Sequence, residues 1–541
     1  MLAFLRSTWP AFLSGLLLTL AFPPWDVTGL AWIALLPIAF YILVSKPSLA
    51  ESARLGYIFG LTHFLTVFYW LTEVTWLGWC FLCLYLSLYP MLWAVVWRVL
   101  VVNKNDEFYL THSVHNRWSV ALAGTTAWVA LEWIRSWFLS GFGWNTLAIS
   151  LAKSPALIQI ADLGGIWLVS VPVAFTGLLF ATLLYTARKS WESKKFFEFR
   201  TELYTWLFVI CAFFFYGIWR IQYPPEVKTS FRYLAIQPAI PQDPWKKAPL
   251  NEVLTVLYNL TKEGWKASGA EKPDIILWPE TPVSASIFQE PEYQSLVRYF
   301  LENYQRPLEL GSIDYAGDAV FNSAAFFQNN LKNPQIYHKQ HLVIMGEYVP
   351  LANWFPLLRR FVPIGVDFST GPGPVLFSLP KPALKLAPLI CFEDTVPSLV
   401  RRAAMKNPDV FINHTNDGWF HTAPTALQHL RNSLFRAIEF RKPMVRVTNT
   451  GITAVIDERG FPLKVFQGAE SIHDRGFLVG EVPIRDYSPT FYTRWGDWFP
   501  LLCVAWTCLA LLQAWAMGKI PKSLFRIFLI KESKRNKSYG K

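Results

Sequence analysis

Long apolar stretches dominate the first part of the chain and return once near its end. Each is about 20 residues long, which is what an α-helix needs to cross a bilayer. Trp and Phe gather near the ends of many of them, as in the aromatic belts of membrane proteins. The stretches lie at roughly 7–24, 28–45, 55–73, 76–100, 118–138, 163–186, 202–220 and 498–517. The pattern predicts a seven-span domain in residues 1–220 and an eighth transmembrane helix at 498–518.

The segments between these stretches differ in their content of Lys and Arg. Those near 46–54, 98–117 and 188–200 are basic, and so is the tail 519–541, whereas the loops near 23–28 and 73–76 have no Lys or Arg. With eight spans, all the basic segments fall on one side, which the positive-inside rule assigns to the cytoplasm. We therefore expect cytoplasmic termini, a basic cytoplasmic tail at 519–541, and an extracytoplasmic domain at 221–497.

The formal net charge of the 541 residues is +12. Much of this excess lies in the predicted cytoplasmic segments, where it sets topology and meets anionic lipid headgroups. A nucleic-acid-binding protein would need a basic, aromatic patch on a soluble face, and the sequence offers none. We therefore expect a membrane partner and no nucleic acid.

Residues 221–497 have a different pattern, with short apolar runs separated by turn signals. Helical patterns at 250–267, 292–304, 395–406 and 424–440 lie between several strand-like runs. The predicted strands are Tyr233–Gln237, Asp274–Trp278, Leu308–Ile313, Ala324–Gln328, Lys385–Cys391, Val410–Asn413, Met444–Asn449, Ile452–Ile456 and Phe477–Val482. Strands that alternate with helices predict an α/β domain.

Cys391 is the one cysteine of this domain, because Cys80, Cys83, Cys211, Cys503 and Cys508 all fall in predicted spans. A lone cysteine is most often a small, inert core residue. Here, however, the strand that ends at Cys391 is followed by "FEDTVPSLVRRAAMK", which resembles a nucleophile elbow. The thiol would lie at the strand tip, with backbone N–H groups and a helix N-terminus beside it.

A nucleophilic thiol needs a base and a group that stabilises an oxyanion. "DIILWPET" places Glu280 after a strand, and "YHKQHLVIMGEYVP" places Lys339 and Glu347 on either side of an apolar run. Taken singly, each charged residue at a strand end is more often solvated than functional.

Taken together, the segments resemble a known family. "LWPET", "YHKQHLVIMGEYVP", "PLICFED" and "NDGWF…QHL…RAIEFRKPMVRVTNTGITAVID" follow one another as in the nitrilase superfamily, and more closely as in its membrane branch, the apolipoprotein N-acyltransferases. The resemblance is strongest over about 233–485; upstream it rests on the span layout and "LEWIRSWFLSGFGWN". It implies a nitrilase-like αββα sandwich beside a multi-span helical membrane domain.

The resemblance also implies roles for particular residues. The catalytic residues would be the base Glu280, Lys339 and the nucleophile Cys391. The supporting or substrate-binding residues would be Glu347, Phe392 through its backbone N–H, Glu393, Trp245, Asn416 and Trp419. The chain has Phe392 where many members have Tyr, and Gly418 where many have Ala.

The resemblance further implies acyl transfer through a thioester on Cys391, as the last step of lipoprotein maturation. A phospholipid such as phosphatidylethanolamine would donate the acyl chain to the α-amine of a diacylglyceryl-cysteine on an apolipoprotein. No cofactor or metal is expected, because no zinc-type spacing occurs outside the membrane segments. We expect a monomer in a bacterial inner membrane, with a periplasmic catalytic domain.

The segment 348–373 is unusually apolar for an external loop. It could fold onto its own domain, or it could form a membrane lid in which Phe355 and Phe361 enter the bilayer while Arg359 and Arg360 meet phosphate. The lipid substrates favour the lid.

Two other function classes compete with this interpretation. A membrane-tethered amidase that hydrolyses a small amide would use the same three residues, but a water-soluble substrate would not require eight spans. A non-catalytic binding protein would be expected to have lost Glu280, Lys339 or Cys391, and all three are present.

Overall fold

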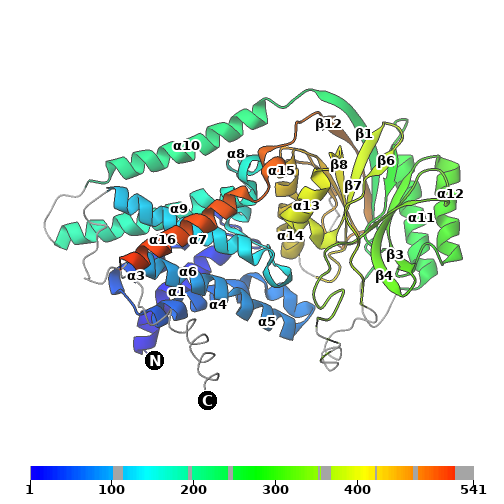
Figure 1. Cartoon of the computed structure of the whole chain (residues 1–541). Coiled ribbons are helices and arrows are strands. Elements are labelled where there is room, and N and C mark those ends of the chain that lie inside the picture. Colours follow the sequence, from blue (N-terminus) through cyan, green and yellow to red (C-terminus); the bar gives the residue numbers. More distant parts are fainter. Residues whose placement is uncertain are drawn as a thin grey trace, which may run out of the picture.

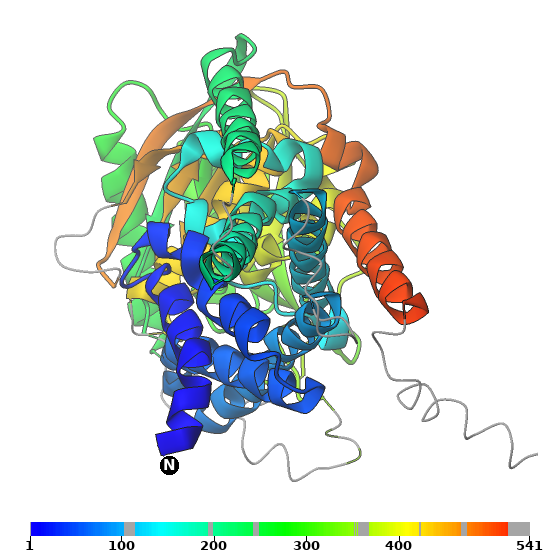
Figure 2. The same cartoon turned by 90° about the vertical axis from the view of Figure 1, so that its left-hand side faces the viewer.

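A computed structural model describes residues 2–101, 114–192, 198–241, 248–350, 352, 354, 367–420, 423–466 and 473–517. A bundle of helices and an α/β domain lie side by side (Figure 1). Turned so that the bundle faces the viewer, its helices lie in front of the sheets (Figure 2). Several predictions fall outside the described residues: Trp245, the lid residues Phe355, Arg359, Arg360 and Phe361, and the tail at 519–541.

A helix or a pair of helices overlies each of the eight apolar stretches. They are α1 (Leu2–Leu20), α2 (Ala31–Ala34) with α3 (Leu36–Ser45), α4 (Leu49–Val67), α5 (Trp76–Leu86) with α6 (Leu88–Val101), α7 (Val114–Arg135), α9 (Ala161–Glu192), α10 (Arg200–Gln222) and α16 (Trp498–Ala516). Two shorter helices are α8 (Pro155–Ile158), which precedes α9, and α15 (Phe491–Trp495), which precedes α16.

Not all of these helices are equally apolar. Five segments within the described residues are long and apolar enough to cross a membrane: Thr28–Ser45, Trp76–Val101, Ala161–Glu192, Arg200–Gln222 and Trp498–Ala516. The apolar helix Ser7–Leu20 is shorter. Helices α4 and α7 have the length but carry more polar side chains, as Glu51 and Arg54 on α4 illustrate.

Close packing within the bundle depends on small residues. A Cβ atom added at Gly56 of α4 would lie 2.4 Å from the backbone oxygen of Pro90 on α6, and one added at Gly60 would lie 2.7 Å from Cα of Ser87. The two glycines therefore let α4 and the α5–α6 segment approach through their backbones, as small residues do in membrane helices.

The α/β domain contains two six-stranded sheets. The first, in the order β12-β1-β2-β3-β4-β5, comprises β1 (Val227–Gln237), β2 (Ile275–Leu277), β3 (Leu308–Ala316), β4 (Ala319–Phe327), β5 (Gln335–His338) and β12 (Gly476–Arg485). The second, in the order β11-β10-β9-β8-β7-β6, comprises β6 (Phe377–Leu379), β7 (Leu384–Ile390), β8 (Val410–Thr415), β9 (Met444–Thr448), β10 (Ala454–Ile456) and β11 (Pro462–Val465). All nine predicted strands are present, and β5, β6 and β11 were missed.

Helices cover the outer faces of both sheets. Buried side chains of the two sheets form one core between them, including Phe231, Ile390 and Val447. Helices α11 (Leu250–Ala267) and α12 (Pro291–Tyr304) pack on the first sheet, and α13 (Pro397–Ala404) and α14 (Ala423–Phe440) cover the second. The predicted αββα sandwich is confirmed. Strand β8 is buried along its whole length, because other layers of the sandwich cover both of its faces.

Buried polar contacts attach α14 and the residues that follow it to the bundle. Arg431 forms an ion pair with Asp26 at 2.7 Å, and Arg441 forms one with Asp162 at 2.8 Å. The carboxylate of Glu439 accepts a hydrogen bond from the backbone N–H of Ile166 at 2.8 Å. The α/β domain is thus held in one orientation against the helices by directional contacts.

Candidate active site

Cys391 lies directly after β7 and opens a short 3₁₀ turn, Cys391–Thr395. Its φ angle is 53°, in the left-handed region that non-glycine residues rarely adopt. Such strain concentrates at functional sites, where the surrounding structure holds it. The sharp turn leaves the thiol at the tip of the strand, as the elbow-like sequence predicted.

Residues from the first sheet surround a buried lysine near this tip. Glu280 follows β2 and Lys339 follows β5. The Lys339 Nζ atom lies 3.5 Å from Glu280 Oε1 and 2.9 Å from Glu347 Oε1. All three side chains are nearly inaccessible to solvent. The structure therefore brings together the three charged residues that the sequence placed far apart.

Asn322 on β4 joins the two carboxylates. Its Nδ2 atom donates to Glu280 Oε1 and to Glu347 Oε1, each at 2.8 Å. Asn322 was not predicted from the sequence, because it lies beside Ser323 and just before the predicted strand Ala324–Gln328.

Cys391 completes the group. Its thiol lies close to the Glu280 carboxylate, to Lys339 and to the backbone N–H of Asn416, which all act on its pKa. Glu280, Lys339 and Cys391 thus meet in one place, together with Glu347 and Asn322.

The charged groups of the site interact strongly because they are buried away from solvent. Burial, together with Glu347, raises the pKa of Glu280, although Lys339 opposes this effect. Burial and the Glu280 charge raise the pKa of Cys391 well above its ordinary value. Burial disfavours the charged form of Lys339, but Glu347 and Glu280 outweigh it and raise its pKa. The arrangement holds a permanent ammonium beside a thiol and a carboxylate that compete for one proton.

Glu393 is buried and connects two loops. It accepts hydrogen bonds from the Tyr337 hydroxyl at 2.8 Å, and from the backbone N–H groups of Gln340 at 2.6 Å and Ile390 at 2.8 Å. Burial raises its pKa to about 7. Glu393 therefore ties the loop that carries Lys339 to the turn that carries Cys391.

Phe392 packs against side chains of the helical bundle. Its ring lies 6.2 Å from that of Phe142 and 5.9 Å from that of Trp144, between centroids, and 5.6 Å from that of His341. The aromatic side chain after Cys391 therefore docks the turn onto the segment 136–145, which belongs to the motif "LEWIRSWFLSGFGWN".

The loop after β8 carries the remaining candidates. The Asn416 side chain is buried, and its Oδ1 atom accepts from the Gly418 N–H at 3.0 Å and from Asn449 Nδ2 at 3.1 Å. This anchoring fixes the backbone N–H that faces the thiol. Trp419, on the same loop, is 44% exposed.

The described residues contain no group of three or more His, Cys, Asp or Glu side chains arranged to hold a metal ion.

Two family models match the chain. One described as apolipoprotein N-acyltransferase N-terminal domain covers residues 14–179, and one described as carbon-nitrogen hydrolase covers residues 239–471. Among solved structures, a nitrilase-superfamily amidase from Nesterenkonia is 17% identical, with a TM-score of 0.37 over 52% of this chain and 99% of the amidase.

Curated relatives match over most of the chain. A protein from Rickettsia prowazekii named apolipoprotein N-acyltransferase is 28% identical, over 87% of this chain and 91% of its own length. Another of that name, from Geobacter metallireducens, is 30% identical over 512 residues, which cover 92% of each protein. On this similarity, which spans both the helical bundle and the sandwich, the chain belongs to the apolipoprotein N-acyltransferase family.

Proposed function

We propose that this protein transfers an acyl chain from a phospholipid to the α-amine of an N-terminal diacylglyceryl-cysteine of an apolipoprotein. Glu280, Lys339 and Cys391 are its catalytic residues, and Cys391 carries the acyl group as a thioester. The observation that carries the proposal is that Lys339 Nζ lies 3.5 Å from Glu280 Oε1, with both groups close enough to the Cys391 thiol to act on its pKa.

In the first half-reaction, the thiol proton passes to Glu280 as sulfur bonds to the ester carbonyl carbon of the donor. Lys339 and the backbone N–H of Phe392 donate hydrogen bonds to the oxyanion. The carbon–oxygen bond to glycerol then breaks, and the leaving oxygen takes the proton from Glu280. A lysophospholipid departs and the acyl thioester remains.

In the second half-reaction, the acceptor amine attacks the thioester carbonyl carbon and gives a proton to Glu280. The carbon–sulfur bond breaks, and the thiolate recovers the proton from Glu280. The product is an amide, and the enzyme returns to its starting state without any cofactor.

Two features support acyl transfer between lipids over hydrolysis of a small amide. The turn that carries Cys391 packs through Phe392 on the aromatic residues Phe142 and Trp144 of the helical bundle. Moreover, the similarity to relatives named apolipoprotein N-acyltransferase includes the bundle itself. The site therefore opens next to the segment of the protein that is suited to a bilayer.

The proposed topology follows from the same setting. We place the protein in a bacterial inner membrane as a monomer with eight spans, both termini in the cytoplasm and the sandwich in the periplasm. The basic loops near 46–54 and 188–200 support this orientation.

Mass spectrometry of the purified protein incubated with phosphatidylethanolamine tests the proposal. We expect an added acyl mass on the peptide that contains Cys391, and its discharge when a diacylglyceryl-cysteine peptide is supplied. The Cys391→Ala variant is the control and should remain unmodified. Failure of the wild-type protein to acquire an acyl group from any phospholipid would refute the thioester mechanism.

A further inference from the structure

A cleft of about 790 Å³ opens beside the active site, between the helical bundle and the sandwich. Ser136, Trp137 and Ser140, which follow α7, line one side. Gln340 and His341, from the loop after β5, and residues of α13 line the other. Cavities of a few hundred to about a thousand Å³ are typical of sites for small organic ligands.

The cleft borders the reacting group. His341 is two residues from Lys339, and its ring stacks on Phe392, the residue after Cys391, at 5.6 Å between centroids. His341 therefore separates the cleft from the turn that carries Cys391, and the cleft lies one aromatic ring away from that turn.

Among the described residues that line the cleft, Arg402 is the only Lys or Arg and Asp367 is the only Asp or Glu. Arg402 lies one helical turn after Ser398 on the same face of α13. Burial, with Lys339 and Arg402 close by, lowers the pKa of His341 to about 4, so this imidazole is neutral at physiological pH. A guanidinium flanked by hydroxyl and amide donors is the pattern that binds phosphate.

The rim of the cleft is apolar. Trp137, Phe138 and Leu139 are 49%, 46% and 66% exposed, which is unusual for side chains of this size unless they face lipid or a partner. The cleft thus combines an apolar rim with an arginine, a hydroxyl and an amide side chain, and it lies beside the turn that carries Cys391.

We propose that Arg402, with Ser398 and Gln340, binds the phosphate of the donor phospholipid and so presents its acyl ester to Cys391. This inference rests on the function proposed above and adds the part of the donor that is recognised and the residue that recognises it. The shared chemistry of the ligand is a phosphate oxygen, whether it belongs to a lipid or to the free anion.

The test compares Arg402→Glu with Lys406→Glu, which makes the same charge change at an exposed residue just past α13, outside the cleft. The readout is the rate of acylation of Cys391 as a function of the concentration of phosphatidylethanolamine, or of phosphate-free diacylglycerol, in mixed micelles. We expect Arg402→Glu to raise the apparent KM for phosphatidylethanolamine by about tenfold, the loss of one charge-assisted hydrogen bond. Its KM for diacylglycerol and both constants of Lys406→Glu should stay at wild-type values.

An equal loss with both donors would overturn the inference, since it would show a general disturbance of the cleft. Competition of the wild-type reaction by excess inorganic phosphate would assign a free-anion site instead. Native mass spectrometry of Cys391→Ala with phosphatidylethanolamine separates this inference from the proposed reaction. If the double variant Cys391→Ala/Arg402→Glu retains one phospholipid fewer than Cys391→Ala alone, the site is supported even if no thioester forms. Equal retention by the two variants refutes it.

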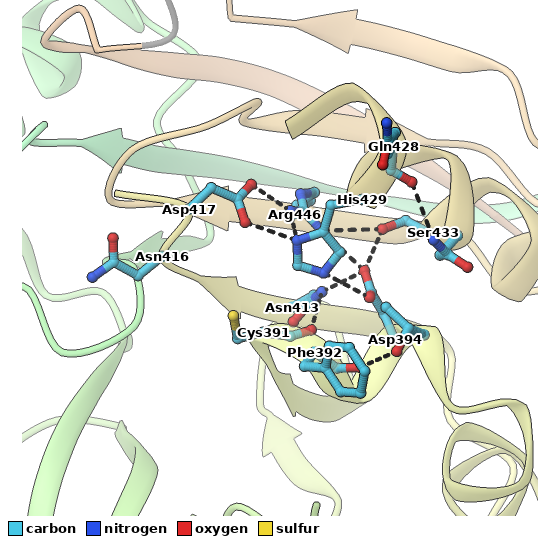
Figure 3. Close-up of polar contacts among 12 residues, drawn as sticks. Cys391, Phe392, Asp394, Asn413, Asn416, Asp417, Gln428, His429, Ser433 and Arg446 are labelled. Carbon is cyan, nitrogen blue, oxygen red and sulfur yellow. Dashed lines mark hydrogen bonds and ion pairs between the residues drawn. The ribbon is translucent and has the colours of Figure 1, made fainter. Parts of the chain in front are cut away.

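An independent observation concerns four buried charged residues behind the nucleophile, Asp394, Asp417, His429 and Arg446, here called the charge cluster (Figure 3). His429 Nε2 lies 3.0 Å from Asp394 Oδ1, and His429 Nδ1 lies 2.8 Å from Asp417 Oδ1. Arg446 donates to the other oxygen of each carboxylate at 2.9 Å. Each carboxylate is therefore bound by both cations.

The cluster connects the two segments that surround the thiol. Asp394 belongs to the turn that begins at Cys391, whereas Asp417 follows Asn416, whose backbone N–H reaches the sulfur. His429 on α14 and Arg446 on β9 hold these segments together from behind. In the sequence, His429 belongs to the quoted motif "QHL", and no role was predicted for it.

Both ring nitrogens of His429 face a carboxylate, so both donate, and Arg446 Nη2, 2.8 Å from Nδ1, donates to Asp417 instead. Burial lowers the pKa of His429, but Asp394 and Asp417 outweigh burial and Arg446 and raise it to about 9. With a cationic imidazole the cluster has two positive and two negative charges. Without it, one uncompensated carboxylate would remain near the thiol.

We infer that the charge cluster positions the Cys391 turn against the Asn416 N–H and that His429, as its second cation, favours the thiolate. The groups that face the sulfur are Glu280, Lys339 and Asp417, and those that face His429 are Asp394, Asp417 and Arg446. His429 acts through these carboxylates and touches no substrate.

The test is the pH dependence of alkylation of Cys391 by iodoacetamide, followed on the Cys391 peptide by mass spectrometry. We expect the profile of His429→Gln to move upward by about one pH unit, as the loss of a nearby cation disfavours the thiolate. His414→Gln is the matched control, because His414 is equally buried and pairs with Glu309 at 2.8 Å. Both variants should lose thermal stability, but an unshifted profile for His429→Gln, or the same shift in His414→Gln, overturns the inference.

Discussion

The ammonium of Lys339 lies 2.9 Å from the carboxylate of Glu347, closer than the 3.5 Å that separates it from Glu280. The proposed base therefore does not hold the lysine as its tightest ion-pair partner. Glu347 takes that position, and its other oxygen accepts from the backbone N–H of Val343 at 2.9 Å. This division leaves Glu280 available to accept a proton from the thiol.

The first prediction concerns Glu347→Gln. Without the Glu347 charge, Lys339 should pair with Glu280 and make that carboxylate a weaker base. We expect kcat for acyl transfer to fall by about a hundredfold, within the range that general-base catalysis contributes, with KM nearly unchanged. Single-turnover acylation of Cys391 measures this directly, and Glu280→Gln, which removes the base, sets the lower limit. A rate within twofold of wild type would show that Glu347 does not govern the lysine.

The second prediction concerns Asn322→Ala and pH. The amide of Asn322 donates to Glu280 at 2.8 Å, which favours the carboxylate form and lowers its pKa against the effect of burial. Removing the donor should raise the pKa of Glu280 further, so a higher pH is needed before the base is deprotonated.

We therefore expect the ascending limb of kcat/KM against pH to move upward by about one unit in Asn322→Ala. Asn303→Ala, which removes an exposed amide that donates to the Tyr299 carbonyl, is the control and should leave the limb in place. A downward shift in Asn322→Ala would contradict the assigned direction.

Much of the fold could be predicted because its signals are local. Apolar stretches of bilayer length marked every helix of the bundle, and alternation with turn residues marked nine strands. The missed strands β5, β6 and β11 have only three or four residues each, too short for a period-two pattern to stand out. Helices α4 and α7 are less apolar than the other long helices because they carry more polar residues. Glu51 and Arg54 of α4 pair with each other, whereas Arg117 of α7 finds its partner, Glu202, on α10.

The candidate site was predictable only in part. Glu280, Lys339 and Cys391 could be identified only through the family resemblance. No spacing along the chain indicates that strands β2, β5 and β7 end close together in the fold. Asn322 lies outside the quoted motifs, and His429 lies in the quoted "QHL" with no role assigned to it there. Their positions depend on the register of β4 and on how α14 lies over the Cys391–Thr395 turn and β9. Contacts between distant elements are not encoded in local patterns, so these residues appear only in the structure.

The third prediction concerns Phe392, which docks the nucleophile turn on Phe142 and Trp144. Phe392→Ala should leave a cavity in this aromatic group and cost about 2 kcal/mol of stability, below the range for fully buried Phe because the side chain is partly exposed. The turn would lose its support, so we also expect slower acylation of Cys391. Thermal unfolding in detergent and single-turnover rates measure the two effects.

The control is Phe392→Leu, which keeps an apolar side chain and should recover most of the stability and most of the acylation rate. Equal behaviour of the two variants would argue against packing as the cause.

The last prediction concerns Asp162, which holds the sandwich to the bundle. Its carboxylate binds Arg441 at 2.8 Å and Arg220 at 2.9 Å, and it accepts from the Tyr216 hydroxyl at 2.7 Å. Asp162→Asn would leave two arginines without their counter-charge, and removing one member of a buried ion pair costs about 3–5 kcal/mol. We therefore expect a large fall in the midpoint of thermal unfolding and faster proteolysis between α10 and β1. Glu192→Gln, which breaks exposed pairs with Arg188 and Lys189, should change the midpoint little, because exposed ion pairs contribute about 1 kcal/mol or less each. Equal midpoints for the two variants would mean that the buried pair does not secure the two parts of the protein.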